Sequence, residues 1–182
     1  MPSYVVLEQE DIAAADKIAY KRDRLALDLD RPPAYGAPAN DGSLASLDMN
    51  VDGVRGEYAG WLYFRPIYWH RFKRDIKGLP DYEVGDLKIN AKTRSKAHYD
   101  LIVHPDDPDA WAYLLIRGHL HPTYEIVGWC WGYEAKTRPL TDPTGCRPKA
   151  HFIKPSDKEI WKEPYLLLDQ VRMRQRLTDL SA

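Results

Sequence analysis

The sequence predicts a single α+β domain in which helices near both ends enclose a run of strands. Its 182 residues correspond to about one domain at roughly 150 residues per domain. Apolar residues recur with helical periodicity near both termini, whereas residues 82–153 contain short apolar runs separated by turn-forming residues. Consecutive strands between terminal helices indicate an α+β fold and not a regular βαβ array.

Three helices are expected, at 8–29, 52–63 and 165–177. The second contains Gly53, Gly56 and Gly60, which have low helix propensity but would let this helix lie close against a sheet. Residues 32–46 are rich in Pro, Gly, Ala and Asn, and this composition predicts an exposed, mobile loop.

Strands are expected at 82–93, 99–103, 111–116, 124–131 and 150–153. The third and fourth flank a turn that ends at His121-Pro122, which predicts a hairpin. The predicted organisation is therefore an N-terminal helix and loop over residues 1–51, a core over 52–153 and a C-terminal helix over 154–182, in one domain overall.

Composition excludes several classes of protein. The 26 basic and 27 acidic residues leave almost no net charge, which excludes a nucleic-acid binder that depends on overall charge alone. No apolar run approaches 18 residues and the N-terminus lacks a signal-peptide pattern, so we expect no membrane span and a cytoplasmic location. Cys130 lies between two tryptophans in an apolar strand, which indicates a buried structural thiol.

One group of polar residues has the chemistry of a metal site. Residues 86, 88, 90 and 92 would share one face of the predicted strand, because side chains alternate along a strand. The Asp86 carboxylate and the Asn90 carboxamide supply oxygen ligands suited to Mg²⁺. Glu57, on the glycine-rich helix, would add a carboxylate, and Lys92 would position or activate water. Alternatively, Asp86 is a turn residue and the lysines form a solvated face.

A resemblance rests on four stretches in this order: Gly56-Glu57-Tyr58-Ala59, Asp86-x-x-x-Asn90-x-Lys92, residues 99–103 and Val127-Gly128-Trp129. Together they resemble small phage-type members of the PD-(D/E)xK nuclease-like superfamily, over about residues 52–153. The resemblance implies a restriction-endonuclease-like core, with a mixed or antiparallel sheet flanked by helices.

The resemblance also implies a metal-dependent nuclease that uses Mg²⁺ or Mn²⁺. Its metal ligands would be Asp86, Asn90 and Glu57, and these three with Lys92 would be the catalytic residues. Asn90 stands where the superfamily usually has Asp or Glu. Two other functions therefore stay open: a catalytically inactive nucleic-acid-binding module of the same fold, and a phage-encoded protein-interaction or inhibitory protein.

A basic and aromatic segment is the second candidate surface. Its expected nucleic-acid-binding residues are Arg71, Lys73, Arg74, Lys88, Arg94 and Lys96. Aromatic residues are interleaved with them, and such a mixture can follow phosphates and stack unpaired bases. We expect nucleic acid as the partner, with DNA preferred to RNA, and the host cytoplasm as the location if the chain is phage-encoded. A homodimer and a merely solvated basic face both stay open.

Overall fold

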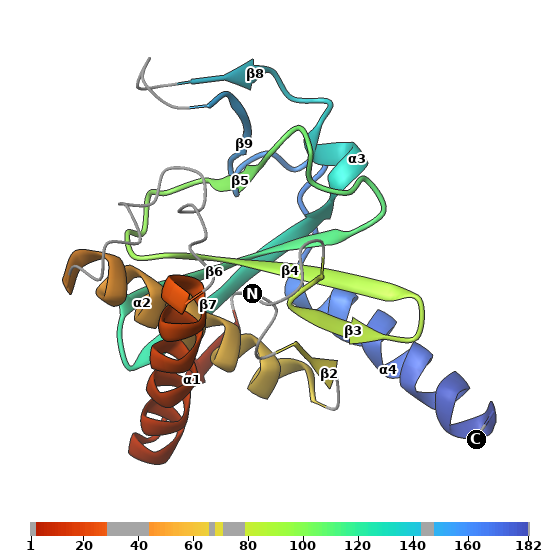
Figure 1. The fold of residues 1–182 in the computed structure, drawn as a ribbon. Coiled ribbons are helices and arrows are strands. Elements are labelled where there is room, and N and C mark those ends of the chain that lie inside the picture. The colour runs from red at the N-terminus through yellow and green to blue at the C-terminus, as the bar shows by residue number, and fades with distance from the viewer. Residues whose placement is uncertain (1–2, 29–43, 66–67, 71–78, 143–147, 182) are drawn as a thin grey trace.

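The computed structural model describes residues 3–28, 44–65, 68–70, 79–142 and 148–181. In chain order its elements are β1 (Ser3–Val6), α1 (Gln9–Asp28), α2 (Leu44–Phe64), β2 (Tyr68–Trp69), β3 (Tyr82–Val84), β4 (Leu87–Arg94), β5 (Leu101–Val103), β6 (Ala112–Leu120), β7 (Thr123–Trp131), α3 (Gly132–Ala135), β8 (Leu140–Thr141), β9 (Ala150–Ile153) and α4 (Pro164–Ser181). Helices therefore flank a run of strands, and the predicted α+β class is confirmed (Figure 1).

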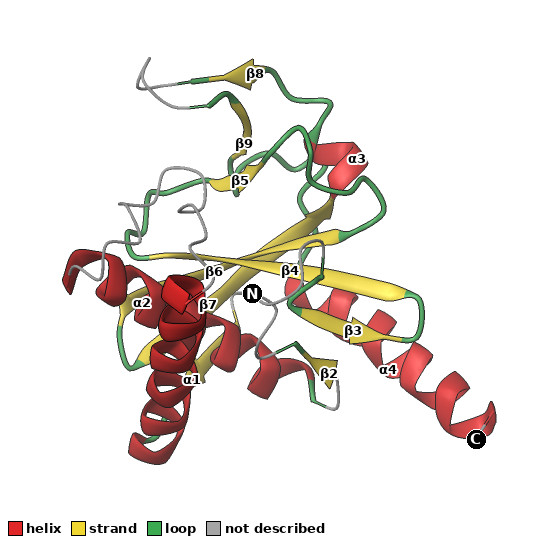
Figure 2. Cartoon of the chain, in the orientation of Figure 1, coloured by secondary structure: helices red, strands yellow, loops and turns green. Residues whose placement is uncertain are grey.

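A curled mixed sheet of six strands forms the centre, in the order β1-β7-β6-β4-β3-β2. β4 and β6 run parallel and the other neighbouring strands are antiparallel. Strands β5, β9 and β8 form a separate small sheet near α3 (Figure 2). β1 was not predicted, and its pairing with β7 makes the first described residues part of the central sheet.

The two faces of the central sheet are covered by different elements. Ala112, Leu114 and Ile116 of β6 belong to the core that contains α1, α2 and part of α4. Tyr113 and Leu115, which alternate with them, belong to a second core with β5, β9 and α3. Because both faces are covered, β6 is buried without interruption from residue 112 to residue 116.

Helix α2 lies very close to the sheet, as its glycines predict. A Cβ atom on Gly56 would overlap the side chain of Thr93 on β4, and one on Gly60 would overlap the hydroxyl of Tyr82. Thr93 Oγ1 also donates a hydrogen bond to Gly53 O at 3.3 Å. The low helix propensity of these glycines is thus offset by close packing of α2 on the sheet.

Several predicted boundaries are wrong. Residues 82–93 are not one strand: β3 and β4 form a hairpin whose turn is Gly85-Asp86. Gly85 has φ +55°, a conformation that glycine adopts without the steric cost of a Cβ. Residues 44–46 of the predicted loop belong to α2, and the remainder of that loop, residues 32–43, lies outside the described residues.

Candidate functional site

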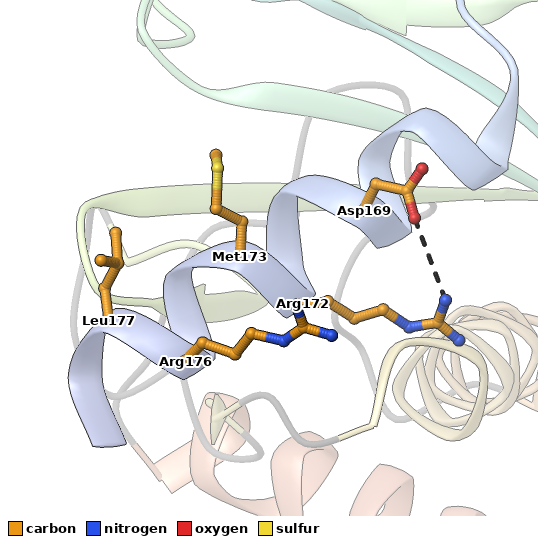
Figure 3. A pocket seen from close by; sticks show the side chains of 5 residues that line it. All are labelled: Asp169, Arg172, Met173, Arg176 and Leu177. Carbon is orange, nitrogen blue, oxygen red and sulfur yellow. Dashed lines mark ion pairs between the residues drawn. The ribbon is translucent and has the colours of Figure 1, made fainter. Parts of the chain in front are cut away.

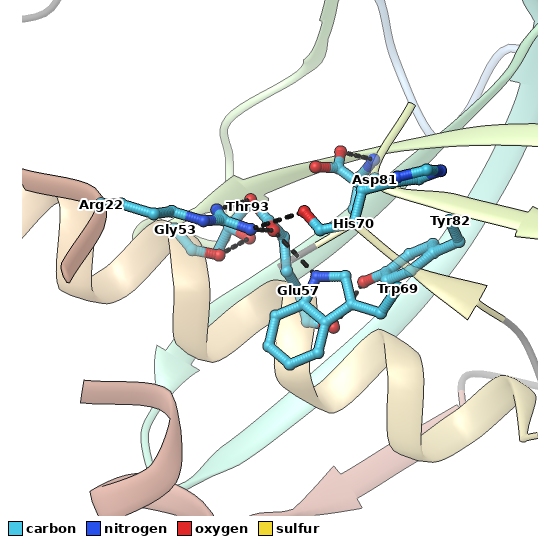
Figure 4. Close-up of polar contacts among 9 residues, drawn as sticks. Arg22, Gly53, Glu57, Trp69, His70, Asp81, Tyr82 and Thr93 are labelled. Atoms are coloured by element: carbon cyan, nitrogen blue, oxygen red, sulfur yellow. Dashed lines mark hydrogen bonds and ion pairs between the residues drawn. The ribbon is translucent and has the colours of Figure 1, made fainter. Parts of the chain in front are cut away.

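Glu57 lies in a buried polar cluster between α1, α2 and the β2–β3 edge of the sheet (Figure 4). Arg22 of α1 donates from Nη1 to Glu57 Oε1 at 3.0 Å and from Nη2 to Oε2 at 2.7 Å. Trp69 Nε1 donates to the same Oε2 at 3.2 Å. The side chains of Arg22 and Glu57 are only 3% and 9% exposed, so this bidentate ion pair is almost completely shielded from water.

Arg22 keeps its positive charge in this buried cluster. Burial alone would lower the pKa of Arg22, but the Glu57 carboxylate outweighs burial and holds that pKa above its ordinary value. Arg22 is therefore charged at any accessible pH, and Glu57 faces a permanent cation. Asp81 also acts on Arg22 electrostatically in the same direction.

Asp81 is the residue of this cluster that sequence reasoning missed. It is fully buried, and its Oδ2 accepts the backbone N–H of Ala91 at 2.7 Å. Its carboxylate is thus held beside the strand segment that contains Asn90 and Lys92. The available signal was the position of Asp81 directly before the predicted strand that begins at Tyr82.

Asp86 does not lie with Glu57. It occupies the β3–β4 turn, its side chain is 84% exposed, and Arg174 Nε of α4 donates to its Oδ1 at 2.7 Å. That hydrogen bond and the charge of Arg174 lower the pKa of Asp86. About 13 Å of extended strand separates residue 86 from residue 90, at roughly 3.3 Å per residue. The predicted strand position of Asp86 is wrong, and the turn position that was the alternative is correct.

Asn90 and Lys92 lie on the sheet face opposite to α2. In the parallel register of β4 with β6, Asn90 pairs with Tyr113 and Lys92 with Leu115, two residues of the second core. Lys92 Nζ lies 3.7 Å from Asp107 Oδ2 and 5.8 Å from the ring centre of Tyr113. Asn90 is buried. The face shared by Asn90 and Lys92 is as predicted, but Glu57 approaches the sheet from the other side.

The predicted metal ligands therefore do not form one oxygen cage. Glu57 has both oxygens on Arg22, Asp86 is bound to Arg174, and Asn90 is neutral. A divalent cation at Glu57 would have to displace a guanidinium that already makes two charge-assisted hydrogen bonds. This arrangement does not fit Mg²⁺ or Mn²⁺. Within the described ranges, no group of three or more His, Cys, Asp or Glu side chains could hold a metal ion.

The predicted nucleic-acid-binding residues divide into two sets. Arg71, Lys73 and Arg74 lie outside the described residues. The other three, Lys88, Arg94 and Lys96, lie along β4 or just beyond it. Lys88 is opposite Glu83 in the β3–β4 register, and Arg94 Nε donates to Asp100 O at 3.2 Å.

Beyond the end of β4, cationic and aromatic side chains gather at the surface. Lys96 Nζ lies 5.4 Å from the ring centre of Tyr99, and the His98 ring packs edge-on against Tyr99 at 4.9 Å. Lys96, His98 and Tyr99 are all exposed. Lys154, another exposed lysine, directly follows Ile153, which pairs with Leu101 in the β5–β9 register. We call Lys96, His98 and Tyr99 the β4-end cluster.

Two other expectations concern the core and the membrane. Cys130 is buried, as predicted, and burial raises the pKa of its thiol to about 12. No helix in the described part of the chain is both long enough and apolar enough to cross a bilayer.

Comparison of the chain with protein-family models, curated proteins and solved structures finds no match.

Proposed function

We propose that this chain is a nucleic-acid-binding module that resembles the PD-(D/E)xK nucleases in fold and performs no metal-dependent cleavage. The proposal includes a restriction-endonuclease-like core, which the resemblance implies. The mixed sheet, the parallel β4–β6 pair and the helix that carries Glu57 are compatible with that core. Metal-dependent cleavage with DNA as the substrate, which the resemblance implies, is the alternative that the experiment below tests.

The β4-end cluster is the observation that carries nucleic-acid binding. An exposed tyrosine offers a stacking face to any base, and a lysine beside it offers a charge to the adjacent phosphate. Lys96 and Tyr99 already lie together: the Lys96 amine lies over the Tyr99 ring, 5.4 Å from its centre, and moves off that face when a base stacks there. The near-zero net charge of the chain makes such a local cluster necessary, because the molecule as a whole does not attract a polyanion.

The Arg22–Glu57 ion pair supports the absence of metal chemistry. A guanidinium occupies the carboxylate that the resemblance assigns to a metal ion, and it brings one fixed positive charge to the same place. Asn90 contributes no negative charge where the superfamily usually has Asp or Glu. Both differences lower the affinity for a hard divalent cation, which depends on anionic oxygen ligands.

Binding is tested by fluorescence anisotropy with labelled single-stranded DNA, single-stranded RNA and duplex DNA over a range of salt concentrations. Tyr99→Ala should weaken binding to single strands by roughly 5- to 150-fold, the equivalent of about 1–3 kcal/mol for one stacked base. Lys96→Ala should weaken binding to all three and reduce the salt slope by about one. The control is Lys17→Ala, which removes an exposed lysine on α1. Equal losses in all three variants would refute the role of the β4-end cluster.

Cleavage is tested on the same substrates with Mg²⁺ and with Mn²⁺. We expect none for the wild-type protein and none for Asn90→Asp, because Glu57 remains bound to Arg22 in both. Metal-dependent cleavage by the wild type that is lost in Glu57→Gln would overturn the proposal and establish the nuclease. Absence of both binding and cleavage would favour a protein-interaction role.

A further inference from the structure

The C-terminal helix α4 has a second face that the domain core does not use. Leu167 and Val171 are buried in the core, and Arg174 is fixed to the β3–β4 turn through Asp86. The C-terminal end of α4 projects away from the rest of the molecule (Figure 1). One side of this helix is therefore anchored, and the other remains at the surface.

Exposed apolar side chains form a stripe along that surface. Its members are Leu166, Met173, Leu177 and Leu180, which are 41%, 54%, 60% and 85% exposed. Successive members are separated by seven, four and three residues, so at about 100° per residue all four fall within roughly 60° of the helix circumference. Large apolar side chains gathered along one line of a surface helix are typical of an interaction site.

Charged residues border the stripe on one side. Asp169, Arg172 and Arg176 lie next to Met173 and Leu177 around an open hollow in the helix surface (Figure 3). Arg172 Nη1 is 3.9 Å from Asp169 Oδ1, and both side chains are more than half exposed, so this pair contributes little to stability. The charges are therefore available to a partner.

The order of these charges selects the orientation of a partner helix. If two copies of α4 packed parallel and in register, Asp169 would face Asp169 and Arg176 would face Arg176. If they pack antiparallel about a two-fold axis, Asp169 of each copy faces Arg176 of the other, and the midpoint of this pairing falls between residues 172 and 173. Met173 then lies at the axis, and Leu180 lies opposite Tyr165. The two Arg172 side chains, which meet beside the axis, are then the one like-charge contact among these residues, against three in the parallel arrangement, and the apolar residues meet.

We infer that α4 binds a second copy of this chain, antiparallel about a two-fold axis beside Met173, with two symmetry-related Asp169–Arg176 ion pairs. The stripe from Leu166 to Leu180 is about 21 Å long at 1.5 Å per residue. A single helix pair of this length is at the small end of the interface size range, below about 1,200 Å² of total buried surface. The dimer should therefore form at micromolar concentrations.

Sedimentation equilibrium of the full chain over a concentration series tests this inference. The wild type should show a monomer–dimer equilibrium, and Met173→Glu should raise the dimer Kd by tenfold or more, about 1.4 kcal/mol or greater. The control is Tyr20→Glu on α1, which introduces the same charge at a helix residue of similar exposure, 53%. That variant should leave the Kd unchanged.

Charge exchange separates antiparallel pairing from nonspecific association. Asp169→Arg alone and Arg176→Asp alone should each weaken the dimer about tenfold or more, because each places like charges in contact twice. The double variant Asp169→Arg/Arg176→Asp should restore most of the wild-type affinity, with helix content checked by circular dichroism. A wild type that stays monomeric, or a double variant as weak as the singles, would overturn the inference. So would a monomeric protein whose DNA affinity falls in Arg172→Glu/Arg176→Glu, since α4 would then be a nucleic-acid surface.

Discussion

Replacing Arg22 with methionine should destabilise the protein severely while keeping most of the side-chain volume. Methionine preserves the apolar stem but removes both hydrogen bonds to Glu57, at 3.0 and 2.7 Å. Because the Glu57 side chain is only 9% exposed, its charge would lose the Arg22 guanidinium in a region of low dielectric. Breaking a buried ion pair in this way costs about 3–5 kcal/mol.

The reasoning also predicts a partial rescue. In Arg22→Met/Glu57→Gln the buried charge is removed together with its partner, and the glutamine oxygen can still accept from Trp69 Nε1. The double variant should therefore recover more than half of the free energy of unfolding lost in Arg22→Met, because a neutral pair escapes the cost of burying a charge that has lost its guanidinium.

Urea denaturation of the wild type, both single variants and the double variant provides the assay, with far-UV circular dichroism and tryptophan fluorescence as two probes. Adding Mg²⁺ to Arg22→Met gives a second readout. If the guanidinium had been excluding a metal ion from Glu57, Mg²⁺ would raise the Tm of this variant and not that of the wild type. A loss below about 1 kcal/mol for Arg22→Met, or no recovery in the double variant, would refute the reasoning.

Three other residues of the fold give direct tests. Gly56→Ala should lower the free energy of unfolding by about 1–3 kcal/mol, because its Cβ would collide with Thr93 of β4. The control Gly53→Ala adds a Cβ that meets nothing within 4 Å, so it should be neutral or stabilise the protein by up to about 1 kcal/mol. Equal effects of the two variants in urea denaturation would contradict the close packing of α2. Arg174→Ala should raise the pKa of Asp86 toward its ordinary value, measured by NMR titration of the carboxyl carbon; an unchanged pKa would mean that the contact with α4 does not form in solution. With the other cysteine replaced by serine, Cys130 should react with a thiol reagent at pH 8 only after denaturation, because burial raises its pKa to about 12; fast reaction of the native protein would contradict that burial.

The sequence by itself determined the three long helices, most of the strands and the α+β class, whereas the short helix α3 was not predicted. These follow from periodicities of about 3.6 and 2 that express local backbone geometry and the need to bury one face of each element. The glycines of α2 also predicted its close packing, and the position of Cys130 between two tryptophans predicted its burial. Such features depend on the immediate neighbours of a residue in the chain.

Tertiary structure alone decided which charges meet. Arg22 and Glu57 are 35 residues apart and come together only because α1 packs against α2. The parallel pairing of β4 with β6 sets which face of the sheet Asn90 points to, and a one-residue difference would reverse it. Opposite charges anywhere in the chain can pair once folding brings them together. Spacing along the chain could therefore indicate Glu57 as a candidate metal ligand, but only the fold reveals that its carboxylate is bound to the Arg22 guanidinium.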